Sequence, residues 1–227
     1  MFRRLIAAMP RTFRDRHRAR LHAFVDRSAS LAARLRGRAF GPRIRRASTG
    51  DVYLHLGCGA VDHPEFTNVD GRYAPHVHVV RALDDLSPFA DGSIALLYAC
   101  HCLEHFPHRR IPTVLAEWRR CLRVGGILRL SVPDFDLLLD IYLRTGRDVR
   151  KIQGTLMGGQ DYAYNFHKTA FNRSSLTELL LEAGFGDVRP WTPGSASLTT
   201  FDDWSGRHRT IDGKIFPVSL NLECTRL

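Results

Sequence analysis

Two glycines followed by an aspartate are the residues of this chain whose types and spacing indicate chemistry most clearly. Gly57 and Gly59 come directly after the apolar run 52–56, and Asp70 closes the next apolar stretch, 66–69. Glycines at a strand end let the backbone turn where a side chain would block a ligand. A carboxylate at the end of the following strand can accept both hydroxyls of a ribose. The pattern therefore predicts a nucleoside site, and a tight turn without a ligand is its alternative interpretation.

Three histidines are the residues best suited to move a proton. His101 and His105 follow the apolar run 94–100, and His167 lies in a later segment that is rich in glycine and aromatic residues. Histidine titrates near neutrality and can take a proton from a hydroxyl group. We rank His167 first as a general base and His101 and His105 after it. In the competing interpretation, Glu104 and His105 only shape the start of the helix that follows.

Several further motifs follow the glycine turn in a fixed order, and each joins the end of one expected element to the start of the next. They are 56–59 (LGCG), 68–70 (NVD), 84–94 (DDLSPFADGSI), 101–105 (HCLEH), 117–133 with its Gly-Gly turn, and 183–185 (AGF). Together they resemble the class I S-adenosylmethionine-dependent methyltransferases over about residues 50–227. Segments 165–168 and 219–223 resemble bacterial members thought to act on glycans or envelope precursors.

The resemblance implies a fold, a cofactor and a set of contacts. The implied fold is α/β, with a doubly wound, seven-stranded, mostly parallel Rossmann-like methyltransferase sheet. The implied cofactor is S-adenosylmethionine, and the implied contacts are Gly57, Cys58, Gly59, Asp70, Asp85, Leu86 and His101. Asp84 is the alternative to Asp85 beside the adenine. His55 departs from the pattern because many relatives carry an acidic residue there for the methionine amino group.

No metal site is predicted. Cys-x-Cys at a strand end lacks the Cys-x-x-Cys loop spacing of structural zinc. This argues against a metal site made of Cys58, Cys100, His101, Cys102 and His105. Small buried thiols at crowded turns explain the cysteines better. Five cysteines without regular spacing also favour reduced thiols, as in the cytoplasm, over a disulfide framework.

The positive charge of the chain is confined to its first part. Residues 1–50 hold 14 arginines and two acidic residues, a charge of +12, whereas 51–227 hold 19 basic and 21 acidic residues, a charge of −2. We therefore divide the chain into a basic helical arm, 1–50, and a methyltransferase domain, 51–227. Helical spacing of apolar residues predicts an amphipathic helix over about 12–36.

The arm has three interpretations. In the first, its apolar stripe packs against the domain. In the second, residues 1–45 lie on an anionic membrane surface or on a partner enzyme that handles a lipid-linked substrate. Nucleic acid is the weakest partner because aromatic residues are not interleaved with the arginines. No run approaches the roughly 20 apolar residues of a membrane span. We expect a cytoplasmic protein, peripheral at most at the inner face of the membrane.

Alternating runs predict βα units around a parallel sheet. The expected strands are 52–56, 66–69, 77–81, 94–99, 126–132, 187–191 and 217–224, and the expected helices are 108–122, 135–144 and 174–183. About 40 residues, 134–173, intervene after the fifth of these strands, and we expect them to form a lid over the carboxyl edge of the sheet. Within the lid, 158–168 combines glycines, aromatic rings and polar groups, a composition that suits a sugar. An aromatic cluster buried under a loop is the alternative.

The leading hypothesis is O-methylation of a saccharide or glycan precursor. Methylation of a membrane-associated small molecule, such as a quinone or a lipid head, is the second, because of the arm. The third is a cofactor-binding partner protein without turnover, motivated by His55 and by the lack of an unambiguous base. Methylation of RNA is weaker, because Ala99–Cys102 stands where an Asn/Asp-Pro-Pro-aromatic motif would follow the strand.

Overall fold

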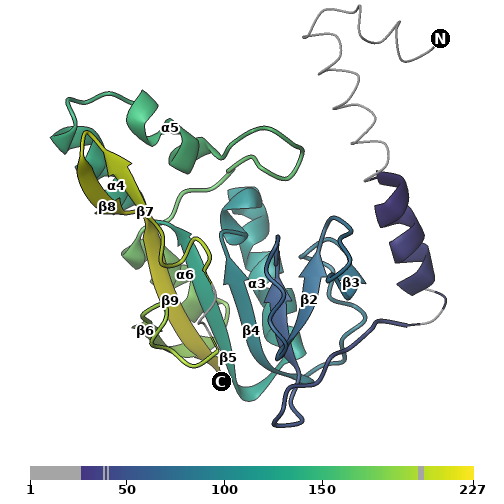
Figure 1. Cartoon of the computed structure of the whole chain (residues 1–227). Coiled ribbons are helices and arrows are strands. Elements are labelled where there is room, and N and C mark those ends of the chain that lie inside the picture. The colour runs from purple at the N-terminus through teal and green to yellow at the C-terminus, as the bar shows by residue number, and fades with distance from the viewer. Residues whose placement is uncertain (1–26, 38, 40, 199–201) are drawn as a thin grey trace, which may run out of the picture.

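A seven-stranded sheet lies at the centre of the molecule (Figure 1). The computed structural model of the chain describes residues 27–37, 39, 41–198 and 202–227. The strand order is β3-β2-β1-β4-β5-β9-β6. The strands are β1 (Tyr53–Leu56), β2 (Phe66–Asp70), β3 (Val79–Val80), β4 (Ile94–Cys100), β5 (Leu122–Pro133), β6 (Phe185–Pro190) and β9 (Ser219–Arg226). Only β9 runs antiparallel to its neighbours, so the predicted seven-stranded, mostly parallel α/β sheet is confirmed.

The central strands are apolar because water reaches neither of their faces. All four residues of β1 are buried, and β4 is buried at six of its seven positions. In the parallel register, Leu56 lies opposite Val69 on one side and Ala99 on the other. Parallel strands point their carboxyl ends to the same edge of a sheet. The residues that follow β1, β2 and β4 therefore meet there.

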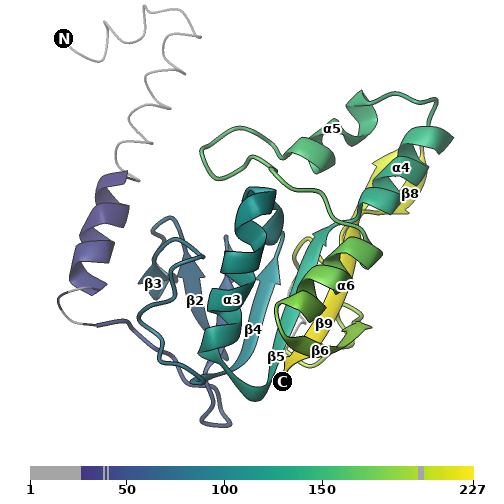
Figure 2. The same cartoon turned by 180° about the vertical axis from the view of Figure 1, so that it is seen from behind.

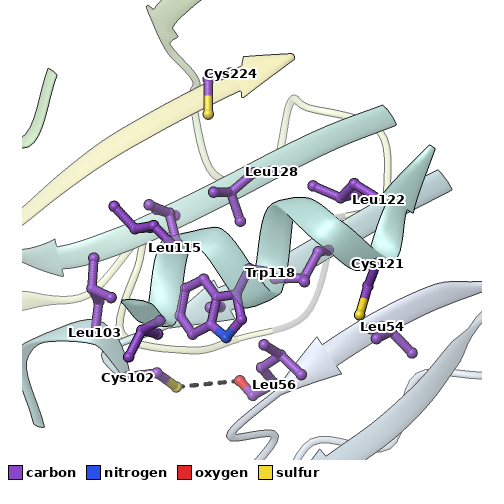
Figure 3. Packing of buried hydrophobic residues seen from close by; sticks show 14 of the residues in the cluster. Leu54, Leu56, Cys102, Leu103, Leu115, Trp118, Cys121, Leu122, Leu128 and Cys224 are labelled. Atoms are coloured by element: carbon purple, nitrogen blue, oxygen red, sulfur yellow. Dashed lines mark hydrogen bonds between the residues drawn. The ribbon is translucent and has the colours of Figure 1, made fainter. Parts of the chain in front are cut away.

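Helices α3 (Ile111–Cys121) and α6 (Arg173–Glu182) cover one face of the sheet (Figure 2). Trp118 of α3 is fully buried among leucines of the strands (Figure 3). Its ring Nε1 donates a hydrogen bond to the carbonyl of Leu83 at 2.7 Å. The same side chain thus fills the core and fixes the loop that follows β3.

The opposite face is covered, among the described residues, by chain without regular structure. Trp191 packs there against Tyr98 and donates through Nε1 to the carbonyl of Leu130 at 2.9 Å. His55 lies in this layer with 2% exposure, its ring 5.1 Å from that of Tyr98 and 5.9 Å from that of Phe66 between centroids. His55 therefore points into a covered face rather than toward the strand ends.

The segment after β5 is more regular than expected. Helix α4 (Phe135–Arg144) has the predicted bounds, but α5 (Arg150–Met157) and the hairpin of β7 (His208–Ile211) and β8 (Lys214–Pro217) were not predicted. Helix α5 lacks a capping side chain and spans only eight residues, so its sequence pattern is weak. The hairpin turns at Asp212-Gly213, both with positive φ. This dipeptide is typical of such turns, so the hairpin did carry a local signal in the sequence.

Element boundaries shift by a few residues elsewhere. The expected strand 77–81 is reduced to β3, because Val77 turns back to the carbonyl of Ala74. The expected helix 108–122 begins with a 3-10 turn, η2 (His108–Arg110), and continues as α3, while β5 starts earlier than its predicted first residue, 126. None of these shifts changes the strand order.

The described part of the arm contacts the domain through polar and small residues. Residues 27–37 are helical, and 12–26 of the predicted helix lie outside the described residues. Ser30 accepts a hydrogen bond from the backbone N–H of Tyr73, and Arg34 donates to the carbonyl of Gly71. Leu31 and Leu35 of the predicted apolar stripe are 59% and 54% exposed. In this part of the arm, the stripe therefore does not pack against the described domain. No described helix has the length and apolarity that a membrane span requires.

Buried His55 should make the protein sensitive to acid. Burial lowers the pKa of His55 from 6.5 to about 3. Between these two pH values His55 is protonated in the unfolded chain but neutral in the folded protein. This group should then reduce the free energy of unfolding by up to about 1.4 kcal/mol per pH unit as the pH falls toward 3. His55→Gln should lessen this slope in urea denaturation followed across that range. His108→Gln, at an exposed site, is the matched control, and an unchanged slope in the His55 variant would contradict the argument.

Candidate active site

The glycine turn after β1 allows a very close approach of the chain that follows β4. Gly57 has φ +63° and Gly59 has φ +55°, and the N–H of Gly57 donates to the carbonyl of Val69 at 2.8 Å. A Cβ atom at Gly57 would collide with the Sγ atom of Cys102. Glycine is therefore required at position 57 by both the backbone conformation and the space available.

Asp70 lies beside this turn at the end of β2. Its Oδ2 accepts from the N–H of Gly59 at 3.2 Å, and its Oδ1 accepts from the N–H of Arg72 at 2.8 Å. An ionised carboxylate offers about four lone-pair positions, so about two remain. These can accept the two hydroxyls of a ribose, and the turn and the aspartate fit the nucleoside part of S-adenosylmethionine.

The loop after β3 carries the residues that were predicted to contact the adenine. Asp84 pairs with Arg110 at 2.8 Å and Asp85 with Arg81 at 3.0 Å, and both carboxylates are partly accessible. Leu86 is fully buried in the core, and its backbone N–H donates to Oε1 of Glu117 at 2.9 Å. Asp85 and Leu86 stay predictions as contacts of the adenine.

Leu83, in the same loop, lies beside the glycine turn that follows β1. Its Cδ1 lies 3.4 Å from where a Cβ of Gly57 would be, and its carbonyl accepts the hydrogen bond from Trp118. Ala33 and Arg34 of helix 27–37 form one wall of a groove whose other residues include Arg81 and Asp85. No local motif in the sequence indicates this wall, since it depends on how the arm packs.

The cysteines near the turn are structural. Cys58 is 3% exposed, and burial raises the pKa of its thiol well above the ordinary value. The thiol of Cys102 donates to the carbonyl of Leu56 (Figure 3) at 3.2 Å. All five cysteines of the chain lie among the described residues as buried free thiols, as the sequence predicted. Cys58 can reach a cofactor through its backbone, but a buried neutral thiol is a poor nucleophile.

The lid returns along the 3-10 turn η1 (Leu103–His105). The backbone N–H groups of Lys168 and Thr169 donate to the carbonyl of Glu104 at 2.8 and 3.2 Å, and the Thr169 hydroxyl donates to the carbonyl of Phe106. These bonds place His167 directly beside the residues that follow β4. Figure 1 shows the chain after α5 passing over the carboxyl ends of the strands.

Three predicted histidines thus meet around one glutamate. The Nδ1 of His101 lies 3.4 Å from Oε1 of Glu104, and the Nε2 of His167 lies 3.8 Å from the same oxygen. The rings of His105 and His167 are 4.8 Å apart between centroids. The sequence-based interpretation of Glu104 was only that it shapes a helix start, although its position in the His-Cys-Leu-Glu-His motif could have drawn attention to it.

Burial removes charge from this cluster. Glu104 is 1% exposed, and neither of its carboxyl oxygens has a hydrogen-bond partner among the described residues. Burial raises the pKa of Glu104 to about 8 and lowers the pKa of His101 to about 3 and that of His167 to about 4. It also lowers the pKa of His105. The histidines are therefore neutral at neutral pH, and their contacts with Glu104 are not ion pairs.

A serine fixes the tautomer of His101. The hydroxyl of Ser219 donates to the carbonyl of Trp204 at 2.8 Å, so it must accept from the Nε2 of His101, 2.9 Å away. In neutral His101 the lone pair then lies on Nδ1, which faces Glu104. Ser219 of β9 thus orients the ring of His101, a predicted site residue.

The glycines of the lid serve close packing. Gly158 has φ +79°, and a Cβ there would lie 2.6 Å from the carbonyl oxygen of Asn165 and 3.0 Å from the His167 ring. At the tip of the lid, the Tyr164 ring lies 3.4 Å from where a Cβ of Gly71 would be, and the guanidinium of Arg72 lies over the Tyr162 ring. The lid tip therefore covers the loop that follows Asp70.

Part of the chain matches a known protein family. Residues 54–130, which run from the glycine turn to β5, match the family described as methyltransferase domain. This segment is similar to that family. The match, the strand order and the curated relatives of the chain support the class I S-adenosylmethionine-dependent methyltransferase family, whose cofactor is S-adenosylmethionine.

Two curated relatives come from Mycobacterium tuberculosis, strains CDC 1551 and H37Rv, and each is named a "Probable S-adenosylmethionine-dependent methyltransferase". Each is 29% identical over 162 residues, an alignment that covers 63% of this chain and 51% of the relative. The chain thus matches about half the length of these curated relatives.

Solved methyltransferase structures are similar to this chain at lower sequence identity. A S-adenosylmethionine-dependent methyltransferase from Archaeoglobus fulgidus is 15% identical, with a TM-score of 0.48 over 91% of this chain and 98% of that one. The 1,6-didemethyltoxoflavin-N1-methyltransferase of Burkholderia thailandensis, solved with S-adenosylhomocysteine, is 17% identical, with a TM-score of 0.47 over 90% of this chain and 80% of that one.

Asp70→Ala should weaken S-adenosylmethionine binding at least about tenfold, because hydrogen bonds to a charged group contribute roughly 1.5–3 kcal/mol. Titration calorimetry measures the change directly. Asp91→Ala removes an aspartate whose side chain is 78% exposed and should leave the affinity unchanged. Equal affinities of the Asp70 variant and the wild type would show that this carboxylate does not hold the ribose.

Proposed function

We propose that this protein is an S-adenosylmethionine-dependent methyltransferase that methylates a hydroxyl group of a saccharide or glycan precursor. The observation that carries the proposal is the meeting of His167, from the lid, with Glu104 and the histidines that follow β4. This cluster adjoins the glycine turn, since Cys102 contacts both Leu56 and the space above Gly57. Proton-accepting groups thus lie near the expected position of the methyl group.

The reaction needs little covalent help from the protein. The sulfonium donor is already activated, so alignment of the acceptor oxygen and exclusion of water provide most of the catalysis. A hydroxyl acceptor must also lose its proton. His167 is our candidate for the group that governs this proton, with His101 and His105 in support.

The lid supplies the surface for a sugar. The side chains of Tyr162, Tyr164 and Phe166 are exposed aromatic rings, and the rings of sugars stack on such faces. Asp161 and Asn165, which hydrogen-bond to each other at 2.6 Å, add polar groups at the same tip. A flat apolar surface with a polar rim is the chemistry that a saccharide requires.

A second candidate acceptor is a membrane-associated small molecule, such as a quinone or a lipid head. The observation that favours it is the exposure of Leu31 and Leu35 on a helix that also carries Arg27, Arg34 and Arg36. Apolar and basic groups side by side suit the surface of an anionic membrane. In this case residues 1–45 would hold the protein at the inner face of the membrane or against a partner enzyme.

His167→Ala should lower methyl transfer by about 100-fold or more, the range for loss of a group that handles the acceptor proton. The assay follows radiolabelled methyl from S-adenosylmethionine into saccharide precursors, and in parallel into quinones or lipids embedded in liposomes. Calorimetry should show unchanged cofactor binding by the variant. His108→Ala, in the exposed turn η2, is the control.

Three outcomes would decide against the proposal. Full activity of the His167 variant would remove this residue from the reaction. Transfer only to liposome acceptors would favour the second candidate over a saccharide. Cofactor binding by the wild type without turnover on any acceptor would favour a non-catalytic partner protein.

A further inference from the structure

The centre of the histidine cluster is surrounded by atoms that can donate lone pairs. Glu104, His105 and His167 each offer one ligand atom, and these three atoms lie within 4.8 Å of one another. Glu104 and His105 come from η1, whereas His167 comes from the lid. The grouping is therefore a product of the fold and not of one local sequence motif.

His105 and His167 each have one ring nitrogen that can bind a ligand at the centre of the cluster. His105 donates its Nδ1–H to the carbonyl of Phe166 at 3.2 Å, which leaves the lone pair of the neutral ring on Nε2. The Nε2 of His167 lies 3.8 Å from Oε1 of Glu104. Histidines that bind metals usually donate their other N–H to a backbone carbonyl or a similar acceptor, as His105 does.

Glu104 is the buried carboxyl group of the cluster. Both of its oxygens are buried and lack a hydrogen-bond partner among the described residues, an arrangement that costs free energy unless another group compensates it. The neighbouring nitrogen of His101 bears a lone pair, since Ser219 takes its proton-bearing nitrogen. Metal ions bind ionised carboxylates, so a cation at this place would take the position of the carboxyl proton and compensate the buried oxygens.

We propose that Glu104, His105 and His167 bind a divalent transition metal ion of the Zn²⁺ class. Two imidazoles and one carboxylate, with a further position open, form a common ligand set of catalytic zinc. Mg²⁺ and Ca²⁺ prefer oxygen ligands, so a set with two nitrogens selects against them. Tetrahedral ligands at about 2.0–2.1 Å from Zn²⁺ lie about 3.4 Å apart, so the side chains would close slightly around the ion.

This site differs from the cysteine-rich set of residues, whose spacing in the sequence argues against a zinc site. It uses no cysteine, and one of its ligands comes from the lid. His101 is not a ligand in this proposal: through its contacts with Glu104 and Ser219 it is a positioning residue that orients the carboxylate.

The role of the ion rests on the proposed function. The oxygen of the acceptor hydroxyl would occupy the open position, where the ion lowers the pKa of this hydroxyl and its proton passes to water. The oxygen then forms its bond to the methyl carbon while the carbon–sulfur bond breaks and its electron pair stays on sulfur. His167 would act in this step as a ligand instead of a free base.

Metal binding can be measured without any acceptor. The full-length chain, freed of metal with a chelator and carrying no polyhistidine tag, is titrated with Co²⁺ while its visible absorption is recorded, and Zn²⁺ is then added as a competitor. We expect one equivalent of Co²⁺ with bands typical of low coordination number, displaced by Zn²⁺. Glu104→Gln and His167→Ala should each weaken Co²⁺ binding more than about 100-fold, beyond the effect of losing a residue that only orients a ligand. His108→Ala should have no effect.

Calorimetry with S-adenosylmethionine on the same samples shows that the variants remain folded and separates the two proposals. Wild-type protein that binds the cofactor and transfers methyl, but binds Co²⁺ and Zn²⁺ no better than the Glu104 and His167 variants, overturns the metal site and leaves the function intact. Protein that binds the metal through these residues but not the cofactor overturns the function and leaves the site.

Discussion

The parallel pairing of β1 with β2 on one side and β4 on the other is the constraint on which the site depends. This register brings Gly57, Asp70 and the residues after Cys100 to one edge of the sheet. No single segment contains the candidate site. The site residues meet because three strand ends, separated by loops of unequal length, must point the same way once the strands are buried on both faces.

The crowding at this edge has a further consequence. Cys102 occupies the space that a side chain at position 57 would need, so the chain after β4 is pressed against the turn and Glu104 is buried behind it. The backbone of the lid then binds the carbonyl of Glu104 through Lys168 and Thr169. A buried carboxyl without hydrogen bonds is costly in an ordinary core. Its presence among neutral histidines is best understood as part of a functional centre.

The lid and helix 27–37 pack around the edge of the sheet that carries the candidate site. Helix α4, helix α5 and the β7–β8 hairpin share a small apolar core that includes Ile141, Ile152 and Phe216. This core supports the lid at its base, while the tip reaches the loop after Asp70. From the other side, helix 27–37 lines a groove next to Asp85. The lid and helix 27–37 thus both lie beside loops that follow the strands at this edge of the sheet.

The sequence by itself determined the sheet, the glycine turn, Asp70 and the three histidines, because apolar periodicity and local turn chemistry are properties of neighbouring residues. It did not determine that Leu86 would be buried, that Leu83 would face the turn, or that Glu104 would become the centre of the histidine cluster. These outcomes depend on the packing of α3 and on the path of the lid, which bring together residues far apart in the chain. Side-chain burial and lone-pair direction arise from such long-range contacts, and only the tertiary structure decided them.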